Sequence, residues 1–312
     1  GHLRSSYYSV FGDSGMVAVL QVLLAAFTAM AIGLLFMGIG RKLTARLQRR
    51  YGAPFWQSYI DVIKCFARKS TSHHFIMDLG SMMGLAGLVA AAMFVPIAGW
   101  LPFPSNGPLI VVLYLMPIGY LGMAMGVSAS GNPLAAIGIG RALTLMVGYE
   151  VPFAIILLGM VATYGTTSLT FLNSVQAGGF LSWNIVRMPI GFLASLIALQ
   201  AMMAEKPFDA MIAPSEIASG PMVELGGKFL GLAFLQHAVA IFIETGLVVN
   251  IFLGGGVTVF DYMAKQFLLY MLAMAANGIY GRYRVEQATK FLWVFAGGLA
   301  FLQLLINMIT GI

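Results

Sequence analysis

Eight long apolar runs set the fold class of this chain, because a helix needs about 20 apolar residues to cross a bilayer. The runs lie roughly at 15–40, 78–98, 109–129, 142–163, 188–204, 228–253, 260–280 and 289–311. Only 9% of the 312 residues are charged, too few to cover the surface of a soluble domain. We therefore expect an all-α integral membrane protein with about eight transmembrane helices, in which residues 1–312 form a single membrane domain.

The basic residues are distributed unevenly among the loops, which predicts the orientation of the chain. Of the 17 lysines and arginines, 14 fall in or beside alternate loops, namely 41–77, 130–141, 205–227 and 281–288. We expect these loops on the inner side of a cytoplasmic membrane and both termini outside, with residues 1–14 as an outer segment. The first run is interpreted as a retained span rather than a signal peptide. The net charge of +6 thus reflects topology, not nucleic-acid binding.

The first inner loop is too long for a simple turn, and residues 55–69 have an amphipathic pattern. Its apolar stripe at helical spacing consists of Phe55, Tyr59, Ile63 and Phe66, and its charged residues are Asp61, Lys64 and Arg68. This pattern predicts a helix on the inner membrane surface. Two interpretations stay open: a linker resting on the membrane, or a helix that roofs a cavity below a docked partner.

Four carboxylates gather in the inner loop 205–227, although the whole chain has only 11 acidic residues. They are Glu205, Asp209, Glu216 and Glu224. Pro207 and Pro214 interrupt helices, and the pair Gly220–Pro221 favours a turn. This acidic loop is therefore expected to fold as an irregular surface rather than a slack connection.

Two glutamates and a histidine are expected inside apolar spans, where an unpaired charge is costly. Glu150 lies in the fourth span, and Glu244 lies in the sixth, two helical turns after His237. Such a carboxyl group must be protonated, paired or next to water, and one that changes between these states can carry protons. His237 could pass protons on from the same helix face. The structural alternative is that each side chain bonds a neighbouring helix.

Metal and nucleotide sites are not indicated. The single cysteine, Cys65, excludes a cluster or zinc site built from several thiolates of this chain and is expected to be inert. His73 and His74 are adjacent rather than at helical spacing. The GIGIGR stretch at 136–141 lacks the preceding strand of a phosphate-binding loop, and we expect a structural turn there.

Four blocks, spread over nearly the whole chain, carry a family resemblance. They are GRKLTARLQRRYGAPFWQSYIDVIK at 40–64, RALTLMVGYEVP at 141–152, EKPFD at 205–209 and GRYRVEQATKFLW at 281–293. They resemble the membrane subunit that complex I (subunit 1 in the usual count) shares with membrane-bound group 4 nickel–iron hydrogenases and formate hydrogenlyases. In that family they correspond to a basic segment with an amphipathic helix, a span with a buried glutamate, an acidic loop and the segment before the last span.

The resemblance implies an oxidoreductase subunit with no redox cofactor, catalytic residue or metal ligand of its own. It would link electron transfer to proton or sodium translocation and anchor hydrogenase-like large and small subunits, with their iron–sulfur clusters and nickel–iron centre. Antiporter-like membrane subunits would be further partners. The implied pathway residues are Glu150, Glu205, Asp209, Glu216, Glu224, His237 and Glu244. The partner-docking inner surface would comprise Arg41, Lys42, Arg46, Arg49, Arg50, Asp61, Lys64, Arg282 and Arg284.

Departures from the complex I pattern favour the hydrogenase branch. RRYGAPFWQ enters the amphipathic helix without the insertion of complex I members, and IASGPMVEL at 217–225 resembles the hydrogenase branch. Ile212 and Pro214 stand where the family often has acids, and His237 stands where many complex I relatives have a glutamate. Three alternatives stay open: a quinone-site subunit of a complex I-like NADH or ferredoxin dehydrogenase, a stand-alone secondary transporter and a purely structural anchor.

Overall fold

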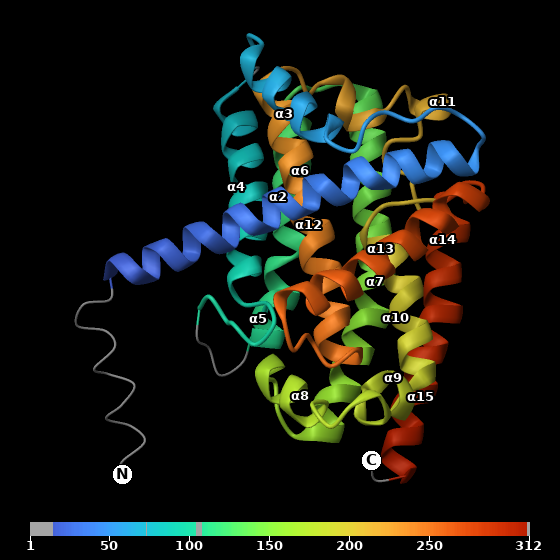
Figure 1. Cartoon of the computed structure of the whole chain (residues 1–312). Coiled ribbons are helices and arrows are strands. Elements are labelled where there is room, and N and C mark those ends of the chain that lie inside the picture. The colour runs from blue at the N-terminus through green and yellow to red at the C-terminus, as the bar shows by residue number, and fades with distance from the viewer. Residues whose placement is uncertain (1–14, 73, 104–107, 311–312) are drawn as a thin grey trace.

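The computed structural model describes residues 15–72, 74–103 and 108–310, and they form helices joined by loops (Figure 1). The first helices are α2 (Gly15–Leu47), α3 (Gln57–Ala67), α4 (Phe75–Met93), α5 (Pro108–Leu115), α6 (Pro117–Ser128) and α7 (Pro133–Tyr164). Next come α8 (Leu169–Val175), η1 (Phe180–Ser182), α9 (Asn184–Arg187), α10 (Pro189–Met202), α11 (Pro214–Ile217) and η2 (Gly220–Val223). The last are α12 (Lys228–Phe252), α13 (Val259–Ile279), α14 (Val285–Phe291), the π-helical turn η3 (Leu292–Gly297) and α15 (Gly298–Thr310). The expected outer segment 1–14 and His73 lie outside the described residues.

Six helices of the described part are long and apolar enough to cross a membrane, so the chain is an all-α membrane protein. They span Val19–Leu47, Phe75–Met93, Pro108–Ser128, Pro133–Tyr164, Lys228–Phe252 and Val285–Ile309. Two of the eight expected spans are not among them. The run at 188–204 gives α10, whose 14 residues extend only about 21 Å, less than the roughly 30 Å of a bilayer core. The run at 260–280 gives α13, where polar residues such as Lys265 and Gln266 lower the hydropathy.

Helix boundaries differ from the expected spans where local signals dominate. α7 begins at Pro133, because the Asn132 side chain accepts the Leu134 N–H and proline suits the first helical position. The GIGIGR stretch at 136–141 therefore lies within a helix, and the expected turn there is wrong. The third span is divided into α5 and α6 at Pro117.

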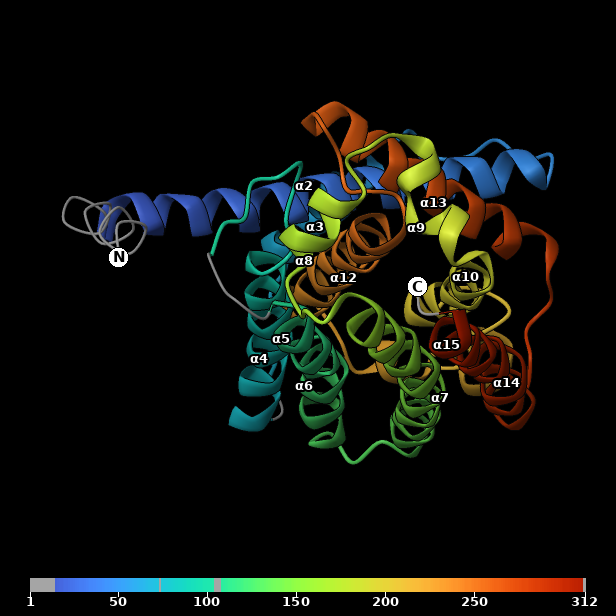
Figure 2. The same ribbon diagram turned by 90° about the horizontal axis from the view of Figure 1, so that it is seen from below.

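Most of the long helices stand side by side, whereas α2 and α13 cross one side of the bundle obliquely (Figures 1 and 2). α2 packs against α13 through Phe36, whose ring centroid lies 5.5 Å from that of Tyr270 and 5.9 Å from that of Phe267. α2 also crosses α12 at Gly33, where an added Cβ would overlap Ala238 O. Glycine is therefore required for this close approach of two backbones.

α12 is the central helix of the molecule. All residues from Ala238 to Phe252 are buried, and 78% of the span lies inside the chain, more than for any other candidate span of the described part. A helix that is hydrophobic on all sides is expected in such a core. The polar residues of α12 are therefore enclosed by protein rather than lipid, which is where intramembrane carboxyl groups are tolerated.

The basic segments expected on one side of the membrane meet at the end of the bundle that carries α3 and α11 (Figure 1). The Asn132 side chain donates a hydrogen bond to Glu224, so the α6–α7 loop touches the acidic loop. The Tyr283 N–H donates to Pro207 O over 2.9 Å and joins the segment before α14 to the same loop. We call this end the acidic-loop end and the opposite one, with α8 and α9, the α8–α9 end. The inner orientation of the acidic-loop end stays a prediction.

The expected amphipathic helix is present as α3 at the acidic-loop end. Ser58 and Val62 are its buried residues, and the helix packs against α2 and α12. The side chains of Ile63 and Phe66, which belong to the predicted apolar stripe, are 67% and 47% exposed. Much of the stripe is thus turned away from this chain, and lipid or another subunit can cover it.

Candidate functional site

An internal cavity of about 220 Å³ lies between α12 and the acidic loop, with mainly apolar walls. Five of the seven predicted pathway residues line it. They are Glu150 on α7, Glu205 and Asp209 in the acidic loop, and His237 and Glu244 on α12. The fold thus gathers carboxyl groups of one loop and of two spans around one space. Their role in ion movement stays a prediction.

The two α12 residues face the cavity together because seven residues make two helical turns. Glu244 is only 3% exposed, and its Oε2 atom has no hydrogen-bond partner among the described residues. Glu150 is partly buried and reaches the same cavity from α7. An unpartnered buried carboxyl oxygen is costly in a structural role, and the cavity leaves room for water beside it.

Burial controls the protonation of the two acidic-loop residues at the cavity. Removal from water and the nearby Asp209 raise the pKa of Glu205 from 4.5 to about 8. Lys206 and a hydrogen bond with Asn277 oppose this shift. Burial also raises the pKa of Asp209, against the effect of Arg282, whose Nη2 lies 2.6 Å from Asp209 Oδ2. Glu205 is therefore suited to take up and release a proton near neutral pH.

A second cavity, of about 390 Å³, lies between α2 and α13 at the acidic-loop end. Its lining includes Tyr51, which is 94% exposed, so this cavity opens to the surface. Met37, Glu205 and His237 line both cavities. These three side chains form the partition between the surface and the internal space, and two of them can carry a proton.

The other two acids of the loop, Glu216 and Glu224, line neither cavity. Glu216 accepts a hydrogen bond from Arg141 Nη1 over 2.6 Å in a half-exposed ion pair. Glu224 accepts a hydrogen bond from Asn132. The loop acids therefore divide into a cavity group (Glu205, Asp209) and a surface group (Glu216, Glu224). For the surface group, a role in a proton pathway stays a prediction.

The residues predicted to dock a partner also divide in two. Arg41 pairs with Asp61 at 2.7 Å, and Arg282 pairs with Asp209, so these side chains are engaged within the chain. Partial burial acts to raise the pKa of Asp61, but hydrogen bonds from Gln57 and Arg41 outweigh it and lower that pKa. The exposed members of the set are Lys42, Arg46, Arg49, Arg50, Lys64 and Arg284.

Sequence reasoning missed the neutral polar residues of the cavity, Tyr120, Tyr149 and Gln236. Tyr120 and Gln236 both donate to main-chain carbonyls of neighbouring helices. Tyr149 directly precedes Glu150, and Gln236 directly precedes His237. Two adjacent polar side chains within an apolar run were therefore the signal that could have identified them. Such neutral donors and acceptors can hold water beside the acids.

Among the residues that the structure describes, no group of three or more His, Cys, Asp or Glu side chains could hold a metal ion. Cys65 lies partly buried on α3 as a free thiol. The cofactors expected in partner subunits are not tested by this chain.

Comparison with known proteins gives a consistent result. The family model of NADH dehydrogenase matches residues 19–308. A membrane subunit of the NADH-quinone oxidoreductase of Dehalococcoides mccartyi (strain CBDB1) is 28% identical over 311 residues, which cover 93% of this chain and 85% of the relative. Hydrogenase-4 component C of Escherichia coli (strain K12) is 28% identical over 276 residues, which cover 83% of this chain and 87% of the relative.

A solved structure shares the fold over almost its whole length. It is a chain from the membrane-bound sulfane sulfur reductase, an archaeal respiratory membrane complex, with a TM-score of 0.87 and 36% identity. The match covers 93% of this chain and 99% of that chain. Fold and relatives together define a class, the multi-pass membrane subunits of complex I-like and hydrogenase-type respiratory complexes. Within this class the chain belongs to the NADH dehydrogenase family, also known as the complex I subunit 1 family, as the sequence blocks predicted.

Proposed function

We propose that this subunit anchors a peripheral redox arm to the membrane and couples electron transfer in that arm to ion translocation. The observation that carries the proposal is one cavity lined by carboxyl groups from the acidic loop and from two membrane spans. Such a cavity lets an electrostatic change at the docking face alter the protonation of groups deep in the membrane. The family match supports the anchoring role, and the cavity supports the coupling role.

The proposed proton route starts in the second cavity, which opens at the acidic-loop end. Glu205 and His237 face both cavities and would pass the proton inward. Glu244 and Glu150 would receive it across the internal cavity. Because Glu150 lies on α7 rather than on the central α12, it would deliver the proton to antiporter-like membrane subunits beside this chain.

Reduction of the nearest iron–sulfur cluster in the partner would drive the change. A unit charge about 10 Å away acts with about 1.7 kcal/mol at an effective dielectric constant of about 20. That energy corresponds to a shift of about one pKa unit. Since the pKa of Glu205 is about 8, a shift of this size changes its proton occupancy near neutral pH.

The docking face would be the exposed basic surface of the acidic-loop end. Lys42, Arg46, Lys64 and Arg284 are exposed there and are suited to hold acidic surfaces of the large and small iron–sulfur subunits. This assignment places the acidic-loop end on the inner side of a cytoplasmic membrane, in agreement with the bias of basic residues.

The test uses the whole complex in sealed vesicles and measures electron transfer and ion translocation separately. Glu150→Gln and Glu205→Gln are expected to lower translocation by about tenfold or more per electron transferred, because an amide cannot exchange the proton. Glu224→Gln is the matched control, a loop acid outside both cavities, and should keep normal translocation. Normal translocation in both cavity variants would overturn the coupling role.

The chemistry of the redox arm is a separate part of the proposal. The departures in the acidic loop and before α3 favour a hydrogenase-type arm with nickel, whereas 36% identity to a subunit of a sulfane sulfur reductase favours a sulfur-reducing arm. Nickel and hydrogen evolution in the purified complex would support the first. Reduction of sulfane sulfur without hydrogen evolution would support the second. A bound quinone would favour the quinone-site alternative, which agrees with the name of a 28% identical relative.

A further inference from the structure

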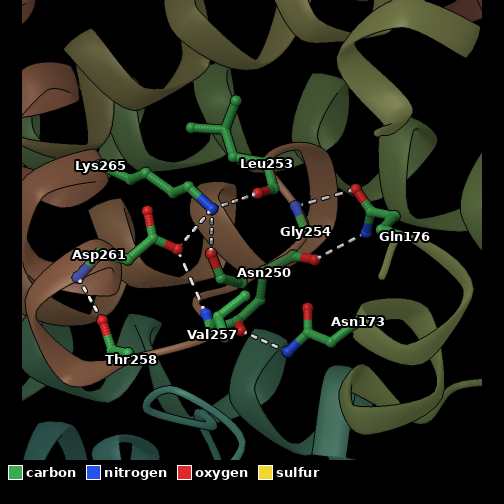
Figure 3. Close-up of polar contacts among 10 residues, drawn as sticks. Asn173, Gln176, Asn250, Leu253, Gly254, Val257, Thr258, Asp261 and Lys265 are labelled. Carbon is green, nitrogen blue, oxygen red and sulfur yellow. Dashed lines mark hydrogen bonds and ion pairs between the residues drawn. The ribbon is translucent and has the colours of Figure 1, made fainter. Parts of the chain in front are cut away.

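The α8–α9 end of α12 holds a second polar cluster, to which the proposed function gives no role (Figure 3). At its centre is Lys265 on α13, whose side chain is only 12% exposed. An ammonium group with so little access to water needs partners within the protein. The nature of these partners shows what this place is built to bind.

Oxygen atoms and one aromatic ring surround the ammonium group. Lys265 Nζ lies 2.9 Å from Gly255 O and 3.1 Å from Leu253 O. Asp261 Oδ2 lies 3.0 Å away, and the Trp183 ring covers another side with its centroid at 4.3 Å. Main-chain carbonyls at a helix C-terminus, together with a carboxylate, are oxygen ligands that suit a monovalent cation, and an aromatic face adds to their attraction.

The oxygen cage is shaped by the backbone rather than by the lysine. Gly254 and Gly255 have φ angles of 71° and 62°, so the chain after α12 turns and its carbonyls converge. Asp261 is held independently: its Oδ2 accepts the Val257 N–H over 3.2 Å, and its own N–H donates to Thr258 Oγ1 over 3.2 Å. The C-terminal end of α12 adds its negative dipole. The cage is therefore preformed for a positive charge.

Side chains of α8 and α9 fix the same end of α12. Gln176 Nε2 donates to Asn250 O over 3.1 Å and to Ile251 O over 3.2 Å. Its Oε1 accepts the Gly254 N–H over 3.0 Å. Asn184 Nδ2 donates to Ile251 O over 2.7 Å. These bonds occupy earlier carbonyls of the helix end and leave the two carbonyls of the cage to the cation.

We propose that this end of α12 is a monovalent-cation site, of the kind that binds Na⁺ or K⁺, which the chain fills permanently with the ammonium group of Lys265. The tethered cation makes the joint between α12 and α13 independent of the salt in solution. Alkali ions do not bind here in the natural chain, because the lysine occupies the cage. The helix that carries His237 and Glu244 is thereby anchored in the same way at any sodium concentration.

The test compares two substitutions in the purified complex. Lys265→Ala leaves room for an ion with water, whereas Lys265→Met fills the same space with an apolar chain. Thermal unfolding is followed in NaCl, KCl and choline chloride at equal ionic strength. Both variants should unfold below the natural complex in choline chloride. Only Lys265→Ala should recover, saturably and by about 5 °C, when Na⁺ or K⁺ is added.

Two controls make the result specific to the cage. The natural complex should show no difference among the three salts, since its site is filled. The double variant Lys265→Ala with Asp261→Asn should lose the recovery, because a carboxylate of the cage is gone. An equal response of Lys265→Ala to all three salts would overturn the proposal. A Lys265→Ala complex that cannot be recovered in any salt would do the same, since a preformed cage must accept an ion.

Discussion

The cavity and the α8–α9 end treat buried polar groups on the same helix in opposite ways. At the α8–α9 end, Gln176 and Asn184 bond to carbonyls of α12, and Lys265 contacts three oxygen atoms. At the cavity, Glu244 Oε2 has no partner among the described residues, and Glu205 is mostly protonated at neutral pH. Both regions belong to one core, so burial alone does not explain the difference.

The difference separates polar groups that hold the fold from polar groups that are free to change state. A buried amide whose donors and acceptors are all used rigidifies its surroundings. A carboxyl group beside a cavity, without a fixed partner, can exchange a proton or a water molecule at little structural cost. Substitutions at the α8–α9 end should therefore alter stability, and substitutions at the cavity should alter coupling.

Gln176→Leu should cause the largest loss of stability. The side chain donates to main-chain carbonyls of α8 and α12 and accepts the N–H groups of Asn184 and Gly254. Leucine is of similar size but leaves these buried groups unpaired, at about 1–3 kcal/mol for each. We expect the unfolding temperature of the complex to fall by about 10 °C. Translocation per assembled complex should stay normal.

The counterpart on the same helix is Glu244→Gln. It replaces a carboxyl oxygen that has no partner among the described residues, so the unfolding temperature should change little while translocation falls. The comparison between the two ends of α12 fails if Glu244→Gln costs as much stability as Gln176→Leu. It also fails if Gln176→Leu leaves the unfolding temperature unchanged.

The second prediction concerns pH. Glu205 binds its proton more tightly in the folded chain, with a pKa of about 8, than in the unfolded chain, with a pKa of 4.5. Its contribution to stability is therefore complete below the unfolded pKa and is lost as the pH rises through the folded one. The unfolding temperature of the natural complex should fall between about pH 6 and pH 9. Glu205→Gln, which cannot titrate, should flatten this part of the curve.

The control for this experiment is Glu224→Gln, which removes a loop acid outside both cavities and should leave the slope unchanged. If Glu205→Gln showed the same decline as the natural complex, another group would be responsible. The cavity would then lose its best candidate for a proton acceptor at neutral pH.

Much of the fold was predictable because its signals are local. Apolar length predicted the membrane class, and the amphipathic pattern predicted α3 within two residues at each end. The failures arose where apolar composition continues past a backbone break. α10 starts at Pro189 and ends at Met202, and the chain then turns at Ala204, which has a φ of 52°, although the apolar run continues. A hydropathy sum does not register where helical hydrogen bonding stops.

The candidate site was predictable only in part, for a related reason. The shared face of His237 and Glu244 follows from their spacing on one helix. Glu205 and Glu216, in contrast, are acids of the same loop, and nothing in their local sequence separates them. Their places are decided by distant residues, since Arg141 on α7 holds Glu216 at the surface. Such tertiary contacts have no counterpart in single-sequence periodicity.

Arg141→Ala should have the smallest effect of the set. The side chains of the Arg141–Glu216 pair are 26% and 50% exposed, and an exposed ion pair contributes about 0–1 kcal/mol. The unfolding temperature should fall by no more than about 2 °C, with normal translocation, and added salt should reduce even this difference.

Arg282→Ala is the informative control, because the Arg282–Asp209 pair has the same 2.6 Å separation but side chains only 16% and 18% exposed. Removing Arg282 leaves Asp209 beside the cavity without its cation, so both stability and translocation should fall. Two ion pairs of equal length in one loop would then differ because only one of them borders the cavity. If Arg141→Ala lowered translocation as much as Arg282→Ala, Glu216 would belong to the ion pathway, and the division of the loop acids into a cavity group and a surface group would be wrong.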